Sequence, residues 1–168
     1  MRDPGRLEAL RLAGLTSAAD PGMDRFARLV SRLLRVPVSL VSLLEPDRQV
    51  FPGMVGMSGP WADRRETPLS HSFCQHVVAD GGPLVLSDTR AHPRTCASLA
   101  IPDLRVVAYA GMPLTDADGR VLGSLCAIDH HPREWTADEL HDLEDLTAAC
   151  SMELRLRIAT ELIQRDRD

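Results

Sequence analysis

Residues 106–129 read VVAYAGMPLTDADGRVLGSLCAID and carry a strong structural signal. Two runs, 106–114 and 120–129, are rich in Val, Leu, Ile and other residues that favour strands. The residues between them, 115–119, read TDADG, and this Asp-Gly composition is typical of a tight hairpin turn. A hairpin pairs its two strands antiparallel, so this stretch predicts an antiparallel sheet.

The chain after the hairpin is predicted to form one long helix. Thr136 is followed three residues later by Glu139, which is the pattern of a capping box at a helix N-terminus. The helix can run to Arg165, and one stripe along it consists of Leu140, Leu143, Thr147, Cys150, Leu154 and Ile158. A second stripe lies on a different side and consists of Met152, Leu156, Ala159 and Ile163. A terminal helix of a monomer needs one buried face. The second stripe therefore favours a partner helix, with packing on the N-terminal helix as the alternative.

The chain before the hairpin contains further helices and strands. Apolar spacings of three and four predict helices over 6–15 and 23–34, and a short helix falls within 70–79. Strands are predicted over 38–45, 49–51 and 83–88. Two segments without a period, 52–69 and 89–105, are predicted as long loops, the second with room for one helical turn. Hairpin strands with helices at both ends of the chain indicate an α+β fold on one antiparallel sheet.

Composition excludes several classes of function. The net charge of -5 argues against a nucleic-acid-binding module, which normally shows a basic face. All 19 basic residues are Arg, so mechanisms that need a Lys nucleophile, a Schiff base or a P-loop are excluded. No apolar signal core or membrane-length apolar run is present, and the four cysteines form no Cys-x-x-Cys pair. We expect a cytoplasmic protein with reduced thiols that does not associate with membranes.

From about Met23 to Leu156 the sequence resembles a GAF domain. The stretches that carry the resemblance are RVPVSLVSLLEPDRQVF, RETPLSHSFCQHVV, LVLSDTRAHPR and VVAYAGMPLTDADGRVLGSLCAIDHHPREWTADEL. They are similar to a bacterial subgroup found beside histidine kinases, diguanylate cyclases and stress-type phosphatases. The resemblance implies a GAF-like, PAS-related α+β fold, with a six-stranded antiparallel sheet and the N- and C-terminal helices on one face. It also implies a small-molecule pocket on the other face, and dimers formed through the terminal helices.

This resemblance divides the chain into three parts. Residues 1–22 are an N-terminal helix and turn, and residues 23–156 are the GAF domain. Residues 157–168 end the last helix and are expected to form a signalling or dimerisation extension. The expected partners are a second copy of the chain, an effector kinase, cyclase or phosphatase, and an unidentified small molecule.

The expected pocket loops differ from the subgroup. Val50 and Pro52 flank Phe51 where the subgroup usually has an aromatic and a basic residue, and the segment 54–61 is unusual in composition. The stretch TCASLAI (95–101) stands where a polar segment containing Asn is common. A relative's ligand is therefore not carried over to this chain.

Residues 70–79, SHSFCQHVVA, concentrate reactive side chains without predicting a metal site. On a helix only His71 and Cys74 share a face, and two ligands do not complete a site. The start of a helix, with Ser72 as N-cap and Gln75 at N3, explains the same residues. Phe73 and Cys74 then begin the buried face of that helix.

Other activities of GAF relatives fit the residues less well. A thiol enzyme similar to free methionine sulfoxide reductases would use Cys74 or Cys96, but Ala97 follows Cys96 where those enzymes have an acidic residue. The cyclic-nucleotide signature needs a Lys, which the chain lacks. Cys74-Gln75-His76 does not match the attachment pattern of bilins, and no cofactor is required, so haem and bilin are not expected.

An apolar pocket is the favoured site. Its predicted lining is Phe51, Met54, Met57, Trp61, Phe73, Cys74, Tyr109 and Cys126. Asp88 and Arg94 are candidates for a polar anchor. The alternative is that these side chains complete the core. The sequence thus predicts a non-catalytic sensory or regulatory domain, binding a small molecule or sensing redox state. The alternatives are the thiol enzyme and a purely structural dimerisation module.

Overall fold

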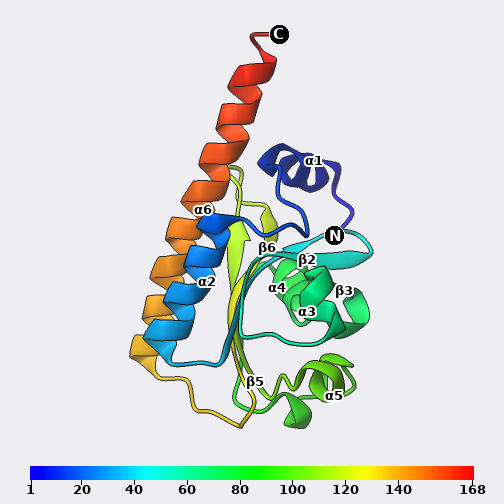
Figure 1. The fold of residues 1–168 in the computed structure, drawn as a ribbon, viewed down its shortest axis with the longest axis vertical. Helices are drawn as coiled ribbons and strands as arrows, with labels where there is room; N and C mark the ends of the chain where they lie inside the picture. Colours follow the sequence, from blue (N-terminus) through cyan, green and yellow to red (C-terminus); the bar gives the residue numbers. More distant parts are fainter.

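Six strands form one antiparallel sheet in the computed structural model, which describes residues 1–168 (Figure 1). Their order across the sheet is β3-β2-β1-β6-β5-β4, and every neighbouring pair is antiparallel. The strands are β1 (Val38–Leu44), β2 (Arg48–Val55), β3 (Glu66–Pro68), β4 (Leu84–Leu86), β5 (Ala108–Thr115) and β6 (Val121–Asp129). The predicted α+β class with a six-stranded sheet is confirmed.

The predicted hairpin is the pair of β5 and β6, joined by a turn that Asp116 organises. Its carboxylate oxygen Oδ1 accepts hydrogen bonds from the backbone N–H groups of Asp118 at 3.0 Å and Arg120 at 2.8 Å. The side chain of Asp116 is buried inside the turn, so the carboxylate replaces solvent as the partner of these N–H groups.

Helices cover the two faces of the sheet unequally. The helices are α1 (Pro4–Ala13), α2 (Pro21–Leu34), α3 (Pro60–Arg64), α4 (Cys74–Asp80), α5 (Ala100–Leu104) and α6 (Ala137–Arg165). Helices α2 and α6 lie side by side on one face, while α3, α4 and α5 lie on the other side (Figure 1). Two 3-10 turns, η1 (Leu69–His71) and η2 (Thr89–Ala91), also belong to the second side. None of the helices combines the length and the apolar composition needed to cross a bilayer.

Alternating strand residues supply two separate cores. Val41 and Leu125 belong to the apolar core under α2 and α6. Leu40 and Cys126, their neighbours in sequence, belong to the second core under α4 and α5. Successive side chains of a strand point to opposite faces, and both faces of this sheet are covered, so the strands read as continuous apolar runs.

The long helix α6 begins at the predicted capping box. The Thr136 hydroxyl accepts from the Glu139 N–H at 3.1 Å, and the Glu139 carboxylate accepts from the Thr136 N–H at 3.0 Å. The first apolar stripe is buried at its centre, around Leu143 and Leu154. The second stripe is exposed: Met152 is 61% accessible, Leu156 62% and Ile163 54%. The C-terminal part of α6 projects beyond the sheet (Figure 1).

The segment 52–69 is more regular than the predicted loop. It contains the end of β2, the short helix α3 and the edge strand β3. The glycine at position 53 reads as a loop residue in the sequence, but it sits in β2 for a packing reason. A Cβ atom there would lie 2.3 Å from the carbonyl oxygen of Met23, so the glycine lets α2 approach the strand.

The segment 89–105 is also partly ordered into helix. It contains η2 and α5, where one helical turn was predicted. Thr89 is buried and ties this segment to the sheet, because its hydroxyl donates to the carbonyl of Val106 at 2.7 Å. The two predicted loops therefore form the ordered cover of one sheet face.

Candidate functional site

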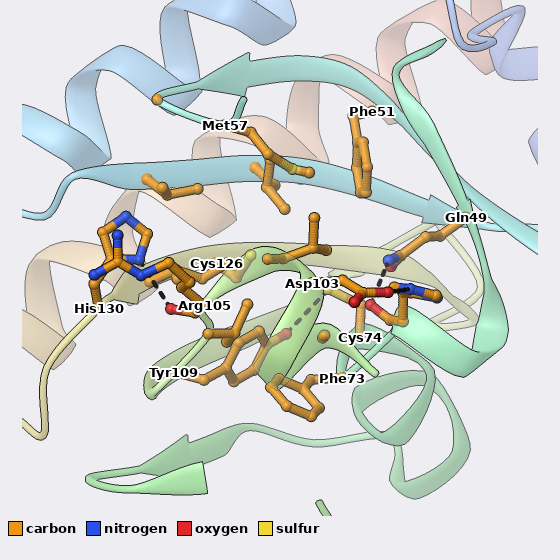
Figure 2. Close-up of a pocket in the computed structure, with 18 of the residues that line it drawn as sticks. Gln49, Phe51, Met57, Phe73, Cys74, Asp103, Arg105, Tyr109, Cys126 and His130 are labelled. Carbon is orange, nitrogen blue, oxygen red and sulfur yellow. Dashed lines mark hydrogen bonds and ion pairs between the residues drawn. The ribbon is translucent and has the colours of Figure 1, made fainter. Parts of the chain in front are cut away.

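A cavity of about 120 Å³ lies between the sheet and the cover formed by α4, α5 and residues 56–58 (Figure 2). Its apolar wall consists of Val38, Leu40, Phe51, Phe73, Val106 and Ile128. Ser58, Asp103 and Arg105 also line it and are exposed, so the cavity connects to solvent between these residues. A concave apolar surface with a few polar groups is the usual form of a small-molecule site.

Tyr109 forms the floor of the cavity because a glycine gives it room. Its ring lies over Gly111, where an added Cβ atom would be 2.3 Å from the phenol oxygen. The Tyr109 hydroxyl is hydrogen-bonded to Cys74 Sγ at 3.0 Å and lies 3.3 Å from Ser124 Oγ. Phe73 meets the same ring edge-on, with ring centroids 5.5 Å apart. This arrangement fixes the phenol at the centre of the site.

Two cysteines, Cys74 on α4 and Cys126 on β6, line the cavity together with Tyr109. Hydrogen bonding from Cys126 lowers the pKa of Cys74 to about 7, against the opposing effect of burial, and the Tyr109 hydroxyl adds to the lowering. Burial raises the pKa of Cys126 and of Tyr109 well above their ordinary values. The site therefore holds one acidic thiol beside two groups that keep their protons.

One end of the cavity is a buried hydrogen-bond network around Gln49. The Gln49 carbonyl oxygen accepts from the hydroxyls of Ser42 at 3.0 Å and Ser72 at 2.8 Å. Its amide nitrogen donates to Thr67 Oγ1 at 2.7 Å and to the carbonyl of His71 at 3.2 Å. Every polar atom of this amide is satisfied, so the network specifies the positions of β2, β3 and η1.

His71 connects this network to the cavity cover. Its Nε2 atom lies 2.7 Å from the Asp103 carboxylate on α5, and its Nδ1 atom lies 2.9 Å from the Ser70 hydroxyl. Trp61 packs against the outer side of the imidazole, with ring centroids 5.0 Å apart. The imidazole is buried, while Asp103 is exposed at the rim.

The opposite end of the cavity carries Arg105 and His130 (Figure 2). Arg105 ends α5 in the left-handed conformation, with φ 54°, and its carbonyl lies 2.8 Å from His130 Nδ1. The cavity thus has a basic end, an apolar middle and an end with Asp103 and Gln49. Such a surface can hold a short molecule that is apolar along its length and polar or anionic at one end.

The structure brings six of the ten predicted residues together. Those that line the cavity are Phe51, Met57, Phe73, Cys74, Tyr109 and Cys126. Met54 packs against the same core without lining the cavity, and Trp61 lies outside it against His71. Asp88 accepts from the backbone N–H of Arg90 at 3.0 Å, and Arg94 pairs with Asp80 at 2.5 Å. The two proposed anchors therefore lie away from the cavity, and a ligand role for all ten stays a prediction.

Four polar residues of the site were not predicted from the sequence: Gln49, Asp103, Arg105 and His130. Gln49 belongs to a strand that was recognised only by its apolar residues. Residues two apart on a strand share a face. Because Gln49 precedes the predicted cavity residue Phe51 by two, its place on the cavity face could have been predicted. Asp103, Arg105 and His130 come from connections whose paths the sequence pattern does not determine.

The Cys-His stretch is divided between different environments. The N-cap of α4 is Phe73 rather than the predicted Ser72, because the helix begins at Cys74; the Ser72 hydroxyl still accepts from the Gln75 N–H at 3.1 Å. The Gln75 side chain donates to the carbonyls of Leu69 at 2.6 Å and Ser72 at 2.8 Å. No three His, Cys, Asp or Glu side chains come together anywhere in a metal-ligand arrangement.

Comparison with known sequences identifies the family of this chain. The family model described as the GAF domain matches residues 22–154. A cyclic di-GMP phosphodiesterase of Pseudomonas aeruginosa is 32% identical over 124 residues, which are 73% of this chain and 20% of that protein. The chain thus spans about a fifth of the length of this curated relative.

Comparison with solved structures shows the same fold. The PixJ GAF domain of Thermosynechococcus elongatus, in its blue-light-absorbing form, has a TM-score of 0.66 at 18% identity, covering 98% of this chain and 96% of that one. A GAF domain from an Acinetobacter phosphoenolpyruvate-protein phosphotransferase has a TM-score of 0.64 at 16% identity, covering 98% and 99%. The free methionine-R-sulfoxide reductase of Neisseria meningitidis, in complex with its substrate, has a TM-score of 0.63 at 18% identity, covering 95% and 89%.

Proposed function

This chain belongs to the GAF domain family, and on that premise we propose that it is a sensory or regulatory domain whose cavity binds a small organic molecule. The observation that carries this proposal is the solvent-connected cavity with its apolar middle and polar ends. A purely structural module would need no such cavity. The domain acts in the cytoplasm, which fits the four free cysteines.

The first route from the cavity to α6 runs through Arg133. His130 lines the cavity and directly follows Asp129, whose carboxylate lies 3.2 Å from the guanidinium of Arg133. The same guanidinium pairs with Glu139 in the capping box of α6 and donates to the carbonyl of Leu34 at the end of α2. A ligand that moves His130 therefore acts on the group that joins the ends of both helices.

The second route runs through Arg65 to α2. Residues 56–58 border the cavity, and this segment continues through α3 to Arg65. The Arg65 guanidinium donates to the Asp24 carboxylate on α2 at 2.7 Å and to the carbonyl of Phe51 at 2.9 Å. Asp24 also accepts from the Met54 N–H at 3.1 Å. Displacement of the 56–65 segment is thus passed to α2, which packs on α6.

The output surface is the exposed stripe of α6, formed by Met152, Leu156, Ala159 and Ile163. Its members are exposed and follow at spacings of three and four, as in a coiled-coil seam, and the C-terminal part of the same helix projects beyond the sheet. We assign this stripe to a homodimer contact. The effector is a neighbouring kinase, cyclase, phosphatase or phosphodiesterase; the last class is supported by the similarity to the Pseudomonas aeruginosa protein.

A thermal-shift screen of small organic acids and related metabolites tests this proposal. Ligands that bind the folded state raise the melting temperature, by an amount that grows with the logarithm of their concentration relative to the Kd. The matched control is Ala100→Leu, because Ala100 is buried and lines the cavity, and its enlargement fills the space. Stabilisation of the wild type that is absent in Ala100→Leu supports the proposal. A strict monomer whose melting temperature no compound changes contradicts it.

Hydrogen exchange tests the relay once a stabilising compound is found. The compound is expected to change hydrogen exchange in residues 130–139 and along α6. Of these residues only His130 lines the cavity, so the change would have to be transmitted. Changes confined to the residues that line the cavity would contradict a relay to α6.

A thiol oxidoreductase is the second candidate, favoured by the placement of Cys74 in the cavity and by the fold of the Neisseria enzyme. Cys96, the other sequence candidate, is exposed and does not line the cavity. A thioredoxin-coupled assay that follows NADPH oxidation with free methionine sulfoxide decides the question. Turnover would assign this activity, and no turnover removes it.

A further inference from the structure

We propose that Cys74 and Cys126 form a thiol pair that small hydroperoxides convert to a disulfide inside the cavity. This inference goes beyond ligand binding, since it assigns the cavity a chemical event of its own.

The fold places the two thiols in one enclosed space. Cys74 is the first residue of α4 and Cys126 lies in the middle of β6, and both side chains line the cavity (Figure 2). Helix α4 packs directly on β6, and both cysteines belong to the same buried cluster as Tyr109, whose hydroxyl contacts Cys74 Sγ at 3.0 Å. The other two cysteines are elsewhere: Cys150 belongs to the core on the opposite face of the sheet, and Cys96 is exposed on a loop.

The surroundings of the two cysteines differ. A two-step oxidation needs one thiol that reacts first and a second that reacts with the product, and a difference in acidity sets this order. The Cys74 sulfur is hydrogen-bonded to the Tyr109 hydroxyl at 3.0 Å and is the more acidic of the two thiols. Burial keeps the pKa of Tyr109 high, so the phenol stays protonated. Its O–H group then donates a hydrogen bond to the Cys74 thiolate. Cys126 keeps its proton for the same reason. Cys74 is therefore the attacking sulfur and Cys126 the resolving one.

Access restricts the oxidant to a small molecule. Cys74 is 3% accessible and Cys126 0%, so neither is reached from the outer surface. The cavity of about 120 Å³ opens past Ser58, Asp103 and Arg105, which are exposed. Hydrogen peroxide and short alkyl hydroperoxides fit this volume, whereas glutathione disulfide, a tripeptide dimer, does not.

The reaction proceeds in two balanced steps. The Cys74 sulfur attacks the terminal oxygen of the hydroperoxide, the O–O bond breaks, and the alcohol (or water, from hydrogen peroxide) leaves with the proton that the thiol gave up. The product is the sulfenic acid of Cys74. The Cys126 sulfur then attacks this sulfenic sulfur, the S–S bond forms, and water leaves with the Cys126 proton. In total, two electrons pass from the two thiols to the peroxide bond.

The disulfide would join α4 to β6 at the cavity floor. It removes the Cys74–Tyr109 hydrogen bond in its present form, because the sulfur then has a covalent partner in place of its proton. Oxidation therefore changes the same wall that a ligand would contact.

Intact-mass measurement and peptide mapping of the Cys96→Ser protein test the proposal. After a small excess of hydrogen peroxide, the protein is expected to lose two hydrogen atoms in mass, and proteolysis is expected to yield a peptide with Cys74 linked to Cys126. Cys150 is an internal reference, since burial raises its pKa to about 12 and it should remain a free thiol. The same protein with glutathione disulfide should stay unmodified.

Two further variants assign the roles of the two sulfurs. Cys126→Ser should gain one oxygen at Cys74, trapped as a sulfenic acid by dimedone, and should form no disulfide. Cys74→Ser should leave Cys126 reduced. The proposal is overturned if Cys74 and Cys126 of the Cys96→Ser protein both remain reduced after the peroxide treatment, or if Cys126→Ser reacts no faster than Cys74→Ser. A negative result leaves the thermal-shift outcome with unreactive ligands unaffected, so the two proposals fail separately.

Discussion

Gly111 determines where the Tyr109 ring lies. The residue has an ordinary backbone conformation, so its role is the absence of a side chain under the phenol. Replacement by any residue with a Cβ atom forces the ring to move away from the position that its contacts with Cys74 and Phe73 define.

We predict that Gly111→Ala displaces the Tyr109 hydroxyl and breaks its contact with Cys74. Overpacking of this kind costs about 1–3 kcal/mol of unfolding free energy. The measurement is chemical denaturation combined with the thermal-shift response. A matched variant, Tyr109→Phe, keeps the ring and removes only the hydroxyl. Unchanged stability and ligand response in Gly111→Ala would show that the ring is free to move.

The reactivity of Cys74 should follow its lowered pKa. The thiolate is the nucleophile, so alkylation of Cys74 by iodoacetamide in the Cys96→Ser protein should rise with pH, with a midpoint near pH 7. The Tyr109 hydroxyl from β5 contacts the sulfur at 3.0 Å, and Cys126 from β6 lines the same cavity. The other titratable groups that line the cavity are His71, Asp103, Arg105 and His130. Peptide mass spectrometry across pH measures the rate. A midpoint near the ordinary thiol value, about 8.5, would contradict the assigned hydrogen bonding.

Sequence pattern predicted the apolar residues of the site better than its polar ones. Phe73, Cys74 and Tyr109 were identified because a buried helix face and a buried strand show a recognisable spacing. Gln49 depends on cross-strand partners that are distant in the sequence, and Arg105 depends on a left-handed backbone turn. These positions follow from tertiary packing, which local pattern does not encode.

At the scale of elements, Arg133 joins the β6–α6 connection to both terminal helices. Its backbone N–H donates to Ser87 at 3.0 Å, and its guanidinium stacks on Trp135 at 4.8 Å from the ring centroid. The side chain is 19% accessible, so its ion pairs with Asp129 and Glu139 are only partly screened by solvent.

We predict that Arg133→Gln separates ligand binding from the response of α6. The cavity does not include Arg133, so a stabilising ligand should still raise the melting temperature. The change in hydrogen exchange at the first turns of α6 should be lost, because the link between Asp129 and Glu139 is gone. Arg120→Gln, which removes a surface ion pair at the hairpin turn, is the control. An unaltered α6 response in Arg133→Gln would exclude this route.

The Asp20 carboxylate both caps α2 and holds α6. It accepts from the N–H groups of Gly22 at 3.0 Å and Met23 at 3.1 Å, and it pairs with Arg157 through two bonds of 2.7 and 3.0 Å. The hydrogen bonds from Arg157 are the main cause that lowers the pKa of Asp20. The stabilisation is therefore fully present at a pH above the pKa of Asp20 in the unfolded chain, about 4. It is lost as the pH falls through the lower pKa that Asp20 has in the folded protein.

We predict that Asp20→Asn lowers the unfolding free energy by about 1 kcal/mol at neutral pH, since it keeps a capping oxygen but loses the charge opposite Arg157. Asp20→Ala should lose about a further 1 kcal/mol, because the cap is removed as well. Denaturation at neutral and acidic pH measures both. The difference between wild type and Asp20→Asn should shrink in acid. A pH-independent difference would show that the charge contributes nothing.

The elements themselves were predicted unevenly. The capping box at Thr136 and the hairpin turn are local signals, and both were found. The three-residue strand β3 was not assigned, because its pairing with β2 and its contact with the Gln49 network decide its conformation. The residues around Gly53 were assigned to a loop, although the glycine there serves close packing between α2 and β2.

At the scale of the whole molecule, we predict that Leu156→Glu abolishes self-association. Like charges facing each other across a helix seam oppose dimer formation, and Leu156 lies at the centre of the exposed stripe. Leu33→Glu is a matched control, because Leu33 is 54% accessible but lies on α2 outside the stripe. Analytical ultracentrifugation measures both. Dimers that persist in Leu156→Glu and disappear in Leu33→Glu would place the seam elsewhere.

The family and fold could be predicted from the sequence because strand order and spacing extend over most of the chain. The cavity lies on one face of the sheet, and helices α2 and α6 lie on the other. The proposed signal therefore passes around the sheet, through the 130–136 connection or through Arg65, because the sheet lies between the cavity and α6.

Native mass spectrometry of the purified wild-type protein and Ala100→Leu, each incubated with the same small-molecule panel, tests the central claim most directly. We predict a non-covalent adduct of one or more compounds on the wild type, absent from Ala100→Leu, whose helical content is unchanged. Bare masses for both proteins throughout the panel, or equal adducts on both, would contradict the assignment of this cavity as a ligand site.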